Sequence, residues 1–200
     1  NGLNLEIPAK LYYTVSPVNE QKVEIKASRN ILDVIKTDIH QGDLRFRFKN
    51  NVIVSGNENI EVFIHAPEVL RLKIAGSGEI KVLNNYMPSA LLVRINGSGA
   101  VAINALASRL VNAERNGSGS LNIQDGAINT GGVDITGSGL VEMRQVIADS
   151  VACKIQGSGN IRLHATDFLH VTISGSGEVR YKGNPIVETS ISGSGKVSRL

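Results

Sequence analysis

The tripeptide Gly-Ser-Gly occurs seven times in this chain of 200 residues, and its spacing constrains the fold more than any other feature. Successive copies begin 18 to 21 residues apart, so they form a repeat and not a pooled flexible linker. A fixed period of this length predicts a solenoid. The copies are Gly76-Ser77-Gly78, Gly97-Ser98-Gly99, Gly117-Ser118-Gly119, Gly137-Ser138-Gly139, Gly157-Ser158-Gly159, Gly175-Ser176-Gly177 and Gly193-Ser194-Gly195.

Apolar residues flank these copies at constant offsets. Ile stands two residues before the first Gly in six of the seven copies, and mostly apolar residues stand four and six residues after it, as do Ile80 and Val82. This alternation predicts short strands that bury one face. Leucine-rich repeats share the period but not the consensus, and propeller blades are about twice as long. We therefore predict an all-β fold, a single-stranded parallel β-helix whose rungs stack about 4.8 Å apart.

The same alternation extends upstream of the first copy. Gly56-Asn57-Glu58 is interpreted as a degenerate copy, and Val15, Ile35 and Val54 align with Ile74 at 19- to 20-residue intervals. We predict one domain, 1–200, of about ten rungs, with degenerate rungs in 1–70 and Gly-Ser-Gly rungs in 71–200. Residues 1–12 are expected to cover the open edge of the first rung. The C-terminal end shows no capping helix, so we expect it to pack on a partner, a second copy or a returning segment.

The two glycines of each copy share the parity of the buried residues. We expect them to face the interior, or a corner without room for a Cβ atom, while Ser faces outward. This structural interpretation is favoured over an exposed row of hydroxyls that binds sugars or ordered water. Neighbouring columns place Arg94 beside Glu114 and Asp134 beside Lys154, and such cross-strand pairs contribute roughly 0.2–1 kcal/mol each.

Two residues depart from the pattern of their columns. Arg115 stands where the other copies have Ile, and we expect its guanidinium to reach water or a bulge to turn it outward, in preference to a binding role. Cys153 falls in an inward column and is expected to behave as a small buried hydrophobe. As a single Cys it cannot form an internal disulfide, so it does not identify the redox compartment.

The search for chemistry finds no catalytic, cofactor or metal residues. No outward column carries the carboxylate pair that glycoside hydrolysis needs, and calcium-repeat, phosphate-loop and nucleophile-elbow motifs are absent. His164, Asp167 and His170 form the only compact group with metal-ligand chemistry, and we expect no metal there. His40 and His65 are interpreted as isolated surface groups.

Composition excludes further classes. Residues 1–70 carry 8 basic and 9 acidic side chains and residues 71–200 carry 13 and 9, without the basic and aromatic clustering of nucleic-acid binders. No apolar run approaches the roughly 20 residues of a transmembrane helix. The chain begins at Asn1 without a signal segment, and we interpret it as a trimmed or mature form whose sequence does not show its localisation.

Several segments, in this order, resemble the putative auto-transporter adhesin, head GIN domain family. They are Val23-Glu24-Ile25-Lys26-Ala27, Asn30-Ile31-Leu32-Asp33, Gly42-Asp43-Leu44-Arg45-Phe46, Val62-Phe63-Ile64-His65-Ala66-Pro67 and Leu72-Lys73-Ile74-Ala75-Gly76-Ser77-Gly78. The resemblance runs from about Leu11 to near the end of the chain. It implies a right-handed parallel β-helix in an extracytoplasmic protein of the Gram-negative envelope, often lipid-anchored, and brings no catalytic residues. Arg115 and Gly56-Asn57-Glu58 depart from the pattern.

Two functions remain. The first is a non-enzymatic, secreted or cell-envelope adhesin or scaffold that binds a surface protein or glycan through the faces or ends of the β-helix. The second, based on fold analogy alone, is a carbohydrate-active lyase or hydrolase with a groove along the β-helix. Ice binding by the Ser row is disfavoured because there is no array of Thr.

Overall fold

The computed structural model describes residues 1–54 and 59–200 and is all-β, with 72% strand and 4% helix. No helix among the described residues is long and apolar enough to cross a membrane. The elements are β1 (Gly2–Leu5), β2 (Lys10–Val15), a 3-10 helix (Val18–Glu20), β3 (Lys22–Lys26), α1 (Arg29–Leu32), β4 (Ile35–His40), β5 (Asp43–Phe48), β6 (Glu61–Ala66), β7 (Arg71–Gly76), β8 (Glu79–Tyr86), β9 (Ala90–Gly97), β10 (Ala100–Gly117), β11 (Ser120–Gly137), β12 (Leu140–Gly157), β13 (Asn160–Gly175), β14 (Glu178–Lys182), β15 (Ile186–Gly193) and β16 (Lys196–Arg199).

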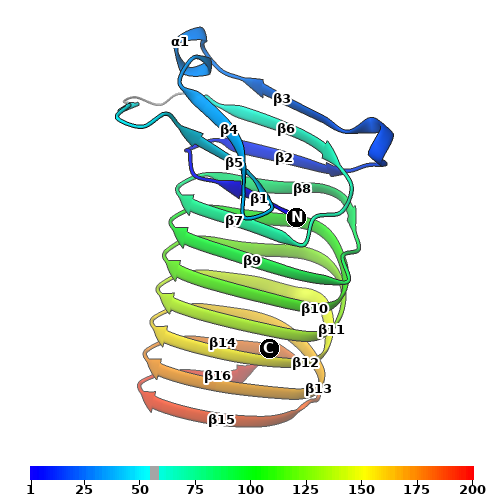
Figure 1. Cartoon of the computed structure of the whole chain (residues 1–200). Coiled ribbons are helices and arrows are strands. Elements are labelled where there is room, and N and C mark those ends of the chain that lie inside the picture. The colour runs from blue at the N-terminus through cyan, green and yellow to red at the C-terminus, as the bar shows by residue number, and fades with distance from the viewer. Residues whose placement is uncertain (55–58) are drawn as a thin grey trace.

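A parallel β-solenoid forms the body of the molecule (Figure 1). Each Gly-Ser-Gly lies at the same corner of its rung, and equivalent residues pair in register, as Ile95, Arg115 and Ile135 do across β9, β10 and β11. The solenoid has about six rungs, which is the number of coils between the first and the last Gly-Ser-Gly. The prediction of about ten rungs is therefore too high.

The overcount lies in residues 1–70, which do not coil in chain order. β3 pairs antiparallel with β6, so Val23 lies opposite Ile64, and β4 pairs antiparallel with β5, so Ile35 lies opposite Phe48. The chain reverses between β4 and β5 at Gln41 and Gly42, both with positive φ. A turn this short can join only antiparallel strands. Apolar alternation is the same in parallel and antiparallel strands, so the sequence pattern counted β3 and β4 as rungs. Gly56-Asn57-Glu58 lies outside the described residues.

The first fifteen residues form a layer of their own, inserted out of chain order. β1 lies between β5 and β7, and β2 lies between β6 and β8, all parallel. Leu5 pairs with Ile74 and Leu11 with Ile80, so Ile7-Pro8-Ala9 occupies the place of Gly-Ser-Gly. Residues 1–12 are expected from the sequence to cover the first of the rungs predicted upstream of Gly76. That prediction is wrong, because β1 and β2 stack on β7 and β8, which form the first Gly-Ser-Gly rung.

The core is a set of inward columns along the solenoid axis. Ile74, Ile95 and Ile135 are almost completely buried, and Cys153, 2% exposed, is a small buried hydrophobe as predicted. Burial raises the pKa of the Cys153 thiol, which keeps it protonated and unreactive.

The Gly-Ser-Gly corners stack through backbone bonds. Gly97 has φ +118°, and a Cβ atom there would lie 2.6 Å from the carbonyl oxygen of Gly76. The N–H groups of Ser98 and Gly99 both donate to that oxygen, at 3.0 and 2.9 Å. A side chain would therefore meet an unfavourable φ and also the backbone of the rung above.

Candidate binding surfaces

The three residues with metal-ligand chemistry do not converge. Nδ1 of His170 lies 3.4 Å from the carboxylate of Glu188, and Asp167 accepts a hydrogen bond of 2.9 Å from Thr166. His164 pairs in register with Lys182 on the neighbouring strand. Across 1–54 and 59–200, no group of three His, Cys, Asp or Glu side chains could hold a metal ion.

Arg115 is buried, contrary to the expectation that its guanidinium reaches water. It is 2% exposed, no bulge interrupts its register with Ile135, and Nε and Nη1 have no hydrogen-bond partner. The guanidinium occupies space left by Gly139, where a Cβ atom would lie 1.1 Å from Nη2, and Nη2 donates to the Gly117 carbonyl at 3.3 Å. Burial lowers the pKa of Arg115 to about 10.

The stacking is disturbed where this guanidinium lies. Asn160 donates its backbone N–H to the carbonyl of Gly139 at 2.8 Å, and each of the other described Gly-Ser-Gly corners makes the equivalent bond, but none joins Leu140 to Gly119. A buried cation without a counter-ion opposes folding. We therefore expect Arg115 to stabilise the fold less than the Ile that stands in this column in the other rungs.

One of the two predicted charge pairs forms. Arg94 donates to Glu114 at 2.7 Å, whereas Asp134 and Lys154 are register neighbours whose side chains make no ion pair in the described structure. Glu142, on the outward face of β12, is held by Arg144 at 2.6 Å and by Arg162 at 3.3 Å. The carboxylates of Glu114 and Glu142 are therefore already ion-paired with arginines of the solenoid.

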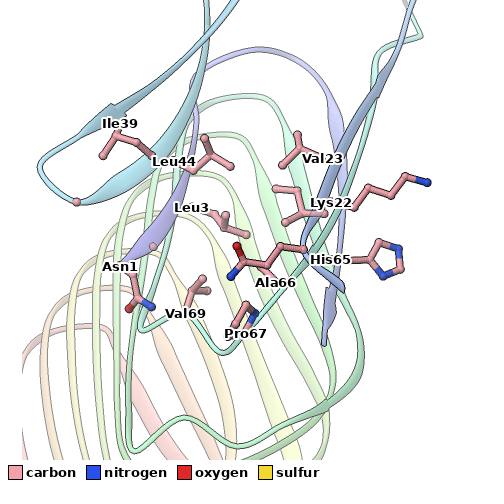
Figure 2. Close-up of a pocket in the computed structure, with 14 residues that line it drawn as sticks. Asn1, Leu3, Lys22, Val23, Ile39, Leu44, His65, Ala66, Pro67 and Val69 are labelled. Atoms are coloured by element: carbon pink, nitrogen blue, oxygen red, sulfur yellow. The ribbon is translucent and has the colours of Figure 1, made fainter. Parts of the chain in front are cut away.

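An apolar hollow lies at the N-terminal end, where the regular rungs stop. It has a volume of about 440 Å³ and lies between β3, the β4–β5 hairpin and the segment after β6 (Figure 2). Its apolar lining includes Leu3, Leu44 and Val69. Val23 and Ile39 line it as well and are 47% and 71% exposed. An apolar group that enters this hollow would remove those side chains from water.

The lining of the hollow is mainly apolar, and Asn1 and Gln21 contribute amide groups to it. The Lys22 and His65 side chains point away from it, whereas Val23, Leu3 and Leu44 point into it (Figure 2). Lys22 is paired with Glu24 at 2.9 Å. In the described structure β3 pairs only with β6 and β4 only with β5, so each strand has a free edge at this end.

A buried carboxylate attaches this end to the first rungs. Asp43, 2% exposed, reaches across β1 to Arg71 at 2.6 Å and to Lys73 at 2.8 Å on β7. The reach depends on Gly2, where a Cβ atom would lie 2.5 Å from the Asp43 carboxylate. Burial raises the pKa of Asp43, but the hydrogen bonds from Arg71 and Lys73 outweigh it and hold the pKa below the usual value.

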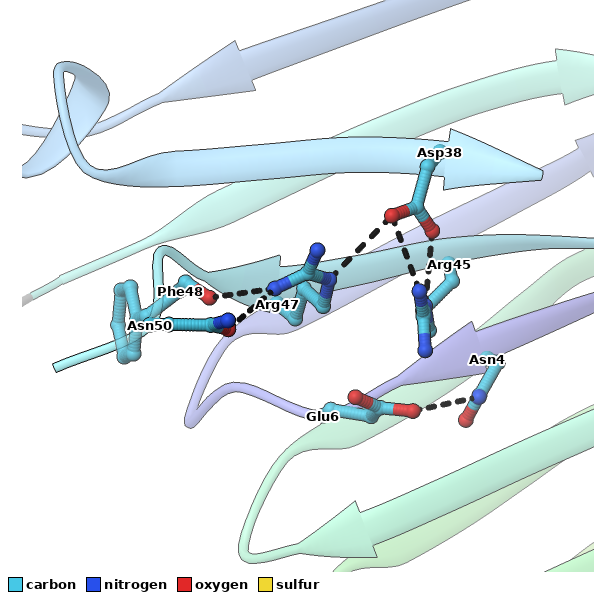
Figure 3. Close-up of polar contacts among 7 residues, drawn as sticks. All are labelled: Asn4, Glu6, Asp38, Arg45, Arg47, Phe48 and Asn50. Carbon is cyan, nitrogen blue, oxygen red and sulfur yellow. Dashed lines mark hydrogen bonds and ion pairs between the residues drawn. The ribbon is translucent and has the colours of Figure 1, made fainter. Parts of the chain in front are cut away.

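A second charged cluster lies on the outer face of the hairpin. Asp38 of β4 accepts from Arg45 at 2.8 and 3.0 Å and from Arg47 at 3.3 Å (Figure 3). These hydrogen bonds lower the pKa of Asp38 to about 2. Arg47 also donates to Asn50, at 3.0 Å. The cluster holds the two strands of the hairpin together beside the hollow.

Two aromatic rings on the outer face of β2 and β6 do not form a binding platform. Tyr12 and Phe63 stack with centroids 5.1 Å apart, Lys26 lies 4.6 Å from the Phe63 centroid, and Lys81 lies 6.0 Å from that of Tyr12. A sugar binds to the open face of a ring, and here the faces are already covered. The column instead joins β3 to the solenoid.

Sequence reasoning missed this N-terminal arrangement although part of its signal was present. Leu3, Leu5, Ile7, Ala9, Leu11 and Tyr13 alternate without interruption and all are buried. With Ile7 in the place of the first Gly, Leu5, Leu11 and Tyr13 fall at the offsets that are apolar in most of the later copies. This layer lacks the Gly-Ser-Gly tripeptide that marks the later rungs, and no local pattern marks Gly2 or Asp43.

Comparison with known proteins agrees with this fold. The family model described as "Putative auto-transporter adhesin, head GIN domain" matches residues 1–185. A putative adhesin from Bacteroides fragilis is 23% identical with a TM-score of 0.93, and the alignment covers 100% of this chain and 92% of that one. A "putative lipid binding protein" from Parabacteroides distasonis is 22% identical with a TM-score of 0.78, covering 100% and 92%.

A putative adhesin from Parabacteroides merdae is 23% identical with a TM-score of 0.75, covering 100% of this chain and 91% of that one. At these identities the likeness establishes the fold. No functionally curated protein matches the chain.

Proposed function

We propose that this chain, which belongs to the putative auto-transporter adhesin, head GIN domain family, is a non-enzymatic binding module of the cell envelope or of secreted proteins. The family and the adhesin-like structures support an extracytoplasmic binding role. The partner is a surface protein or glycan, as the sequence predicts, and the structure favours a protein. The observation that carries this choice is the apolar hollow at the N-terminal end.

An extended apolar segment of a partner protein fits this end best. The free edges of β3 and β4 offer backbone donors and acceptors for an added strand. The hollow beside them can take a buried side chain next to Leu44 and Val69. Glycan sites require exposed ring faces and converging polar groups, whereas the rings of Tyr12 and Phe63 are covered and the lining of the hollow is mainly apolar.

A binding screen with two matched variants tests this proposal. The whole chain is immobilised and probed with purified surface and extracellular-matrix proteins and with a glycan array. We expect a protein ligand whose binding falls at least tenfold in Ile39→Lys, because the new charge lies at the rim of the hollow, and is unchanged in Leu83→Lys, which places the same charge on β8. Binding confined to glycans, binding equal in both variants or no binding at all would contradict the proposal.

A lipid acyl chain is the second candidate for the same hollow. Its apolar lining favours such a ligand, and one similar structure is described as a putative lipid binding protein. A fluorescent long-chain fatty acid should then gain intensity with the native chain and lose it in Leu44→Asp, whereas Ile147→Asp should leave the signal unchanged. Saturable fatty-acid binding without any protein ligand would favour this candidate over the first.

The seven Gly-Ser-Gly corners are assigned a structural role in this proposal. Their positive φ values and close backbone stacking support it, and it leaves the Ser hydroxyls without a required ligand. The right-handed coil and self-association through the solenoid ends remain predictions.

A further inference from the structure

One corner of the solenoid exposes apolar side chains over several successive rungs and is not used by the proposed function. Ala107, Ala127 and Ile147 form one outward column by register. Arg109, Asn129 and Asp149 lie two residues further along each rung, between the register neighbours Ser108–Ile128–Ala148 and Leu110–Thr130–Ser150. A third column begins at Ala90 and ends at Phe168 and Ile186. We call these three columns the corner surface.

The corner surface changes in size and charge along the solenoid axis. Ile147 and Phe168, at its C-terminal half, are 49% and 52% exposed, and the equivalent positions toward the N-terminus are the smaller Ala107 and Ala90. Larger apolar residues also lie there, because Met87, 60% exposed, borders Ala107 and Leu110 belongs to the column of Ala90. A hollow of about 410 Å³ accordingly lies over Ala107 and Ala127. Such an uncovered apolar surface is unfavourable in water.

Charge follows the same gradient. Arg109 is exposed and makes no ion pair in the described structure, while Asp149, two rungs further, binds only the amide of Asn129, at 2.7 Å. Arg109 therefore lies on the rung of Ala107, and Asp149 lies on the rung of Ile147.

We propose that a second copy of this chain binds the corner surface antiparallel, related by a two-fold axis through the rung of Ala127. A two-fold axis in this orientation places each column against its own reversed copy. Ile147 of one copy then enters the hollow over Ala107 of the other, and Phe168 meets Ala90. Arg109 meets Asp149 in both halves, so large residues face small ones and opposite charges face each other about one axis.

The contact is short, which sets its expected strength. Five stacked rungs span about 19 Å, so the buried area falls in the class of small, transient interfaces. We expect a dimer with a dissociation constant in the micromolar range or weaker, and salt should weaken it because the two Arg109–Asp149 pairs lie at the surface.

Charge reversal in single and combined form tests the dimer. Sedimentation velocity is recorded for the whole chain from roughly 1 μM to 1 mM, the range that a weak dimer requires. Arg109→Asp and Asp149→Arg, each alone, should weaken association roughly tenfold or more, because like charges then face each other twice. The double variant should restore it.

Ile147→Asp should also abolish association, whereas Ile39→Asp, an equally drastic change at the distant N-terminal end, should not. A native chain that stays monomeric throughout, or a double variant as weak as the single ones, would overturn the proposal. Circular dichroism confirms that each variant is folded. The outcome is independent of the ligand screen, since Ile39 belongs only to the N-terminal hollow.

Discussion

Residues 71–200 and residues 1–70 use the same inward columns but build them by different means. In the solenoid every corner is a Gly-Ser-Gly with positive φ at the first Gly, and the chain order of the rungs is their spatial order. In the N-terminal region Ile7-Pro8-Ala9 makes the equivalent corner, where Ala9 donates to the Ile7 carbonyl at 2.8 Å and Ile7 does not have a positive φ.

One stacking geometry is therefore specified by local sequence in the solenoid and by tertiary contacts in the N-terminal region. A Gly-Ser-Gly rung repeats its own turn, so each rung specifies the next. The N-terminal layer is held instead by contacts between segments far apart in sequence, such as Asp43 with Arg71, and by strands that run antiparallel. That second mode closes the end of the solenoid and creates the apolar hollow.

Replacing a corner glycine should destabilise the solenoid more than any other change proposed below. Gly137→Ala puts a Cβ atom at φ +118° and 2.5 Å from the Gly117 carbonyl oxygen, and we expect a loss of about 3 kcal/mol or more in the free energy of unfolding. Urea unfolding measures it. Ser138→Ala, in the same corner but facing outward, should change stability by less than about 0.5 kcal/mol. Equal losses in both variants would mean that the corner is not limited by its glycine.

The second prediction concerns the tertiary contact that Asp43 makes with Arg71 and Lys73. Asp43→Asn removes the charge shared by Arg71 and Lys73, and we expect a loss of about 2–3 kcal/mol, concentrated in the N-terminal region. Hydrogen exchange should show faster exchange in β1 and β5 than in β11 and β12. Uniform exchange throughout the chain would show that the two regions unfold as one unit.

The lowered pKa of Asp43 predicts that its contribution to stability depends on pH. Its pKa in the folded chain is below the ordinary 3.8, so its stabilising contribution is present at neutral pH and is lost as the pH falls below about 4 through the folded pKa. The stability difference between the native chain and Asp43→Asn should therefore shrink in acid.

The smallest effect improves the solenoid. Arg115→Ile restores the residue type of its column and removes an unpaired buried cation, so we expect stability to rise by about 1–2 kcal/mol. Urea unfolding at neutral pH measures it, with Ile135→Arg as the inverse variant, which should destabilise. A loss of stability in Arg115→Ile would indicate that the guanidinium has a partner that offsets its burial.

Much of the solenoid could be predicted from particular residues. The Ile before each Gly-Ser-Gly and the apolar residues after it place Cys153 in the core and Arg94 beside Glu114, as the structure shows. The same reasoning misplaced Arg115. The pattern of a column gives the direction of a side chain, but it does not show whether a guanidinium at its end can reach solvent. It also counted β3 and β4 as rungs, since alternation does not reveal strand direction.

Local sequence is sufficient to specify the parallel stacking, its period and the inward columns of residues 71–200, because each rung there carries its own turn residues and its own apolar alternation. Tertiary contacts set the order of the N-terminal strands, the contact between Asp43 and Arg71 across Gly2, and the hollow beside β3 and β4. These features depend on which segments far apart in sequence pack together, and local sequence patterns do not determine the free energy of those contacts.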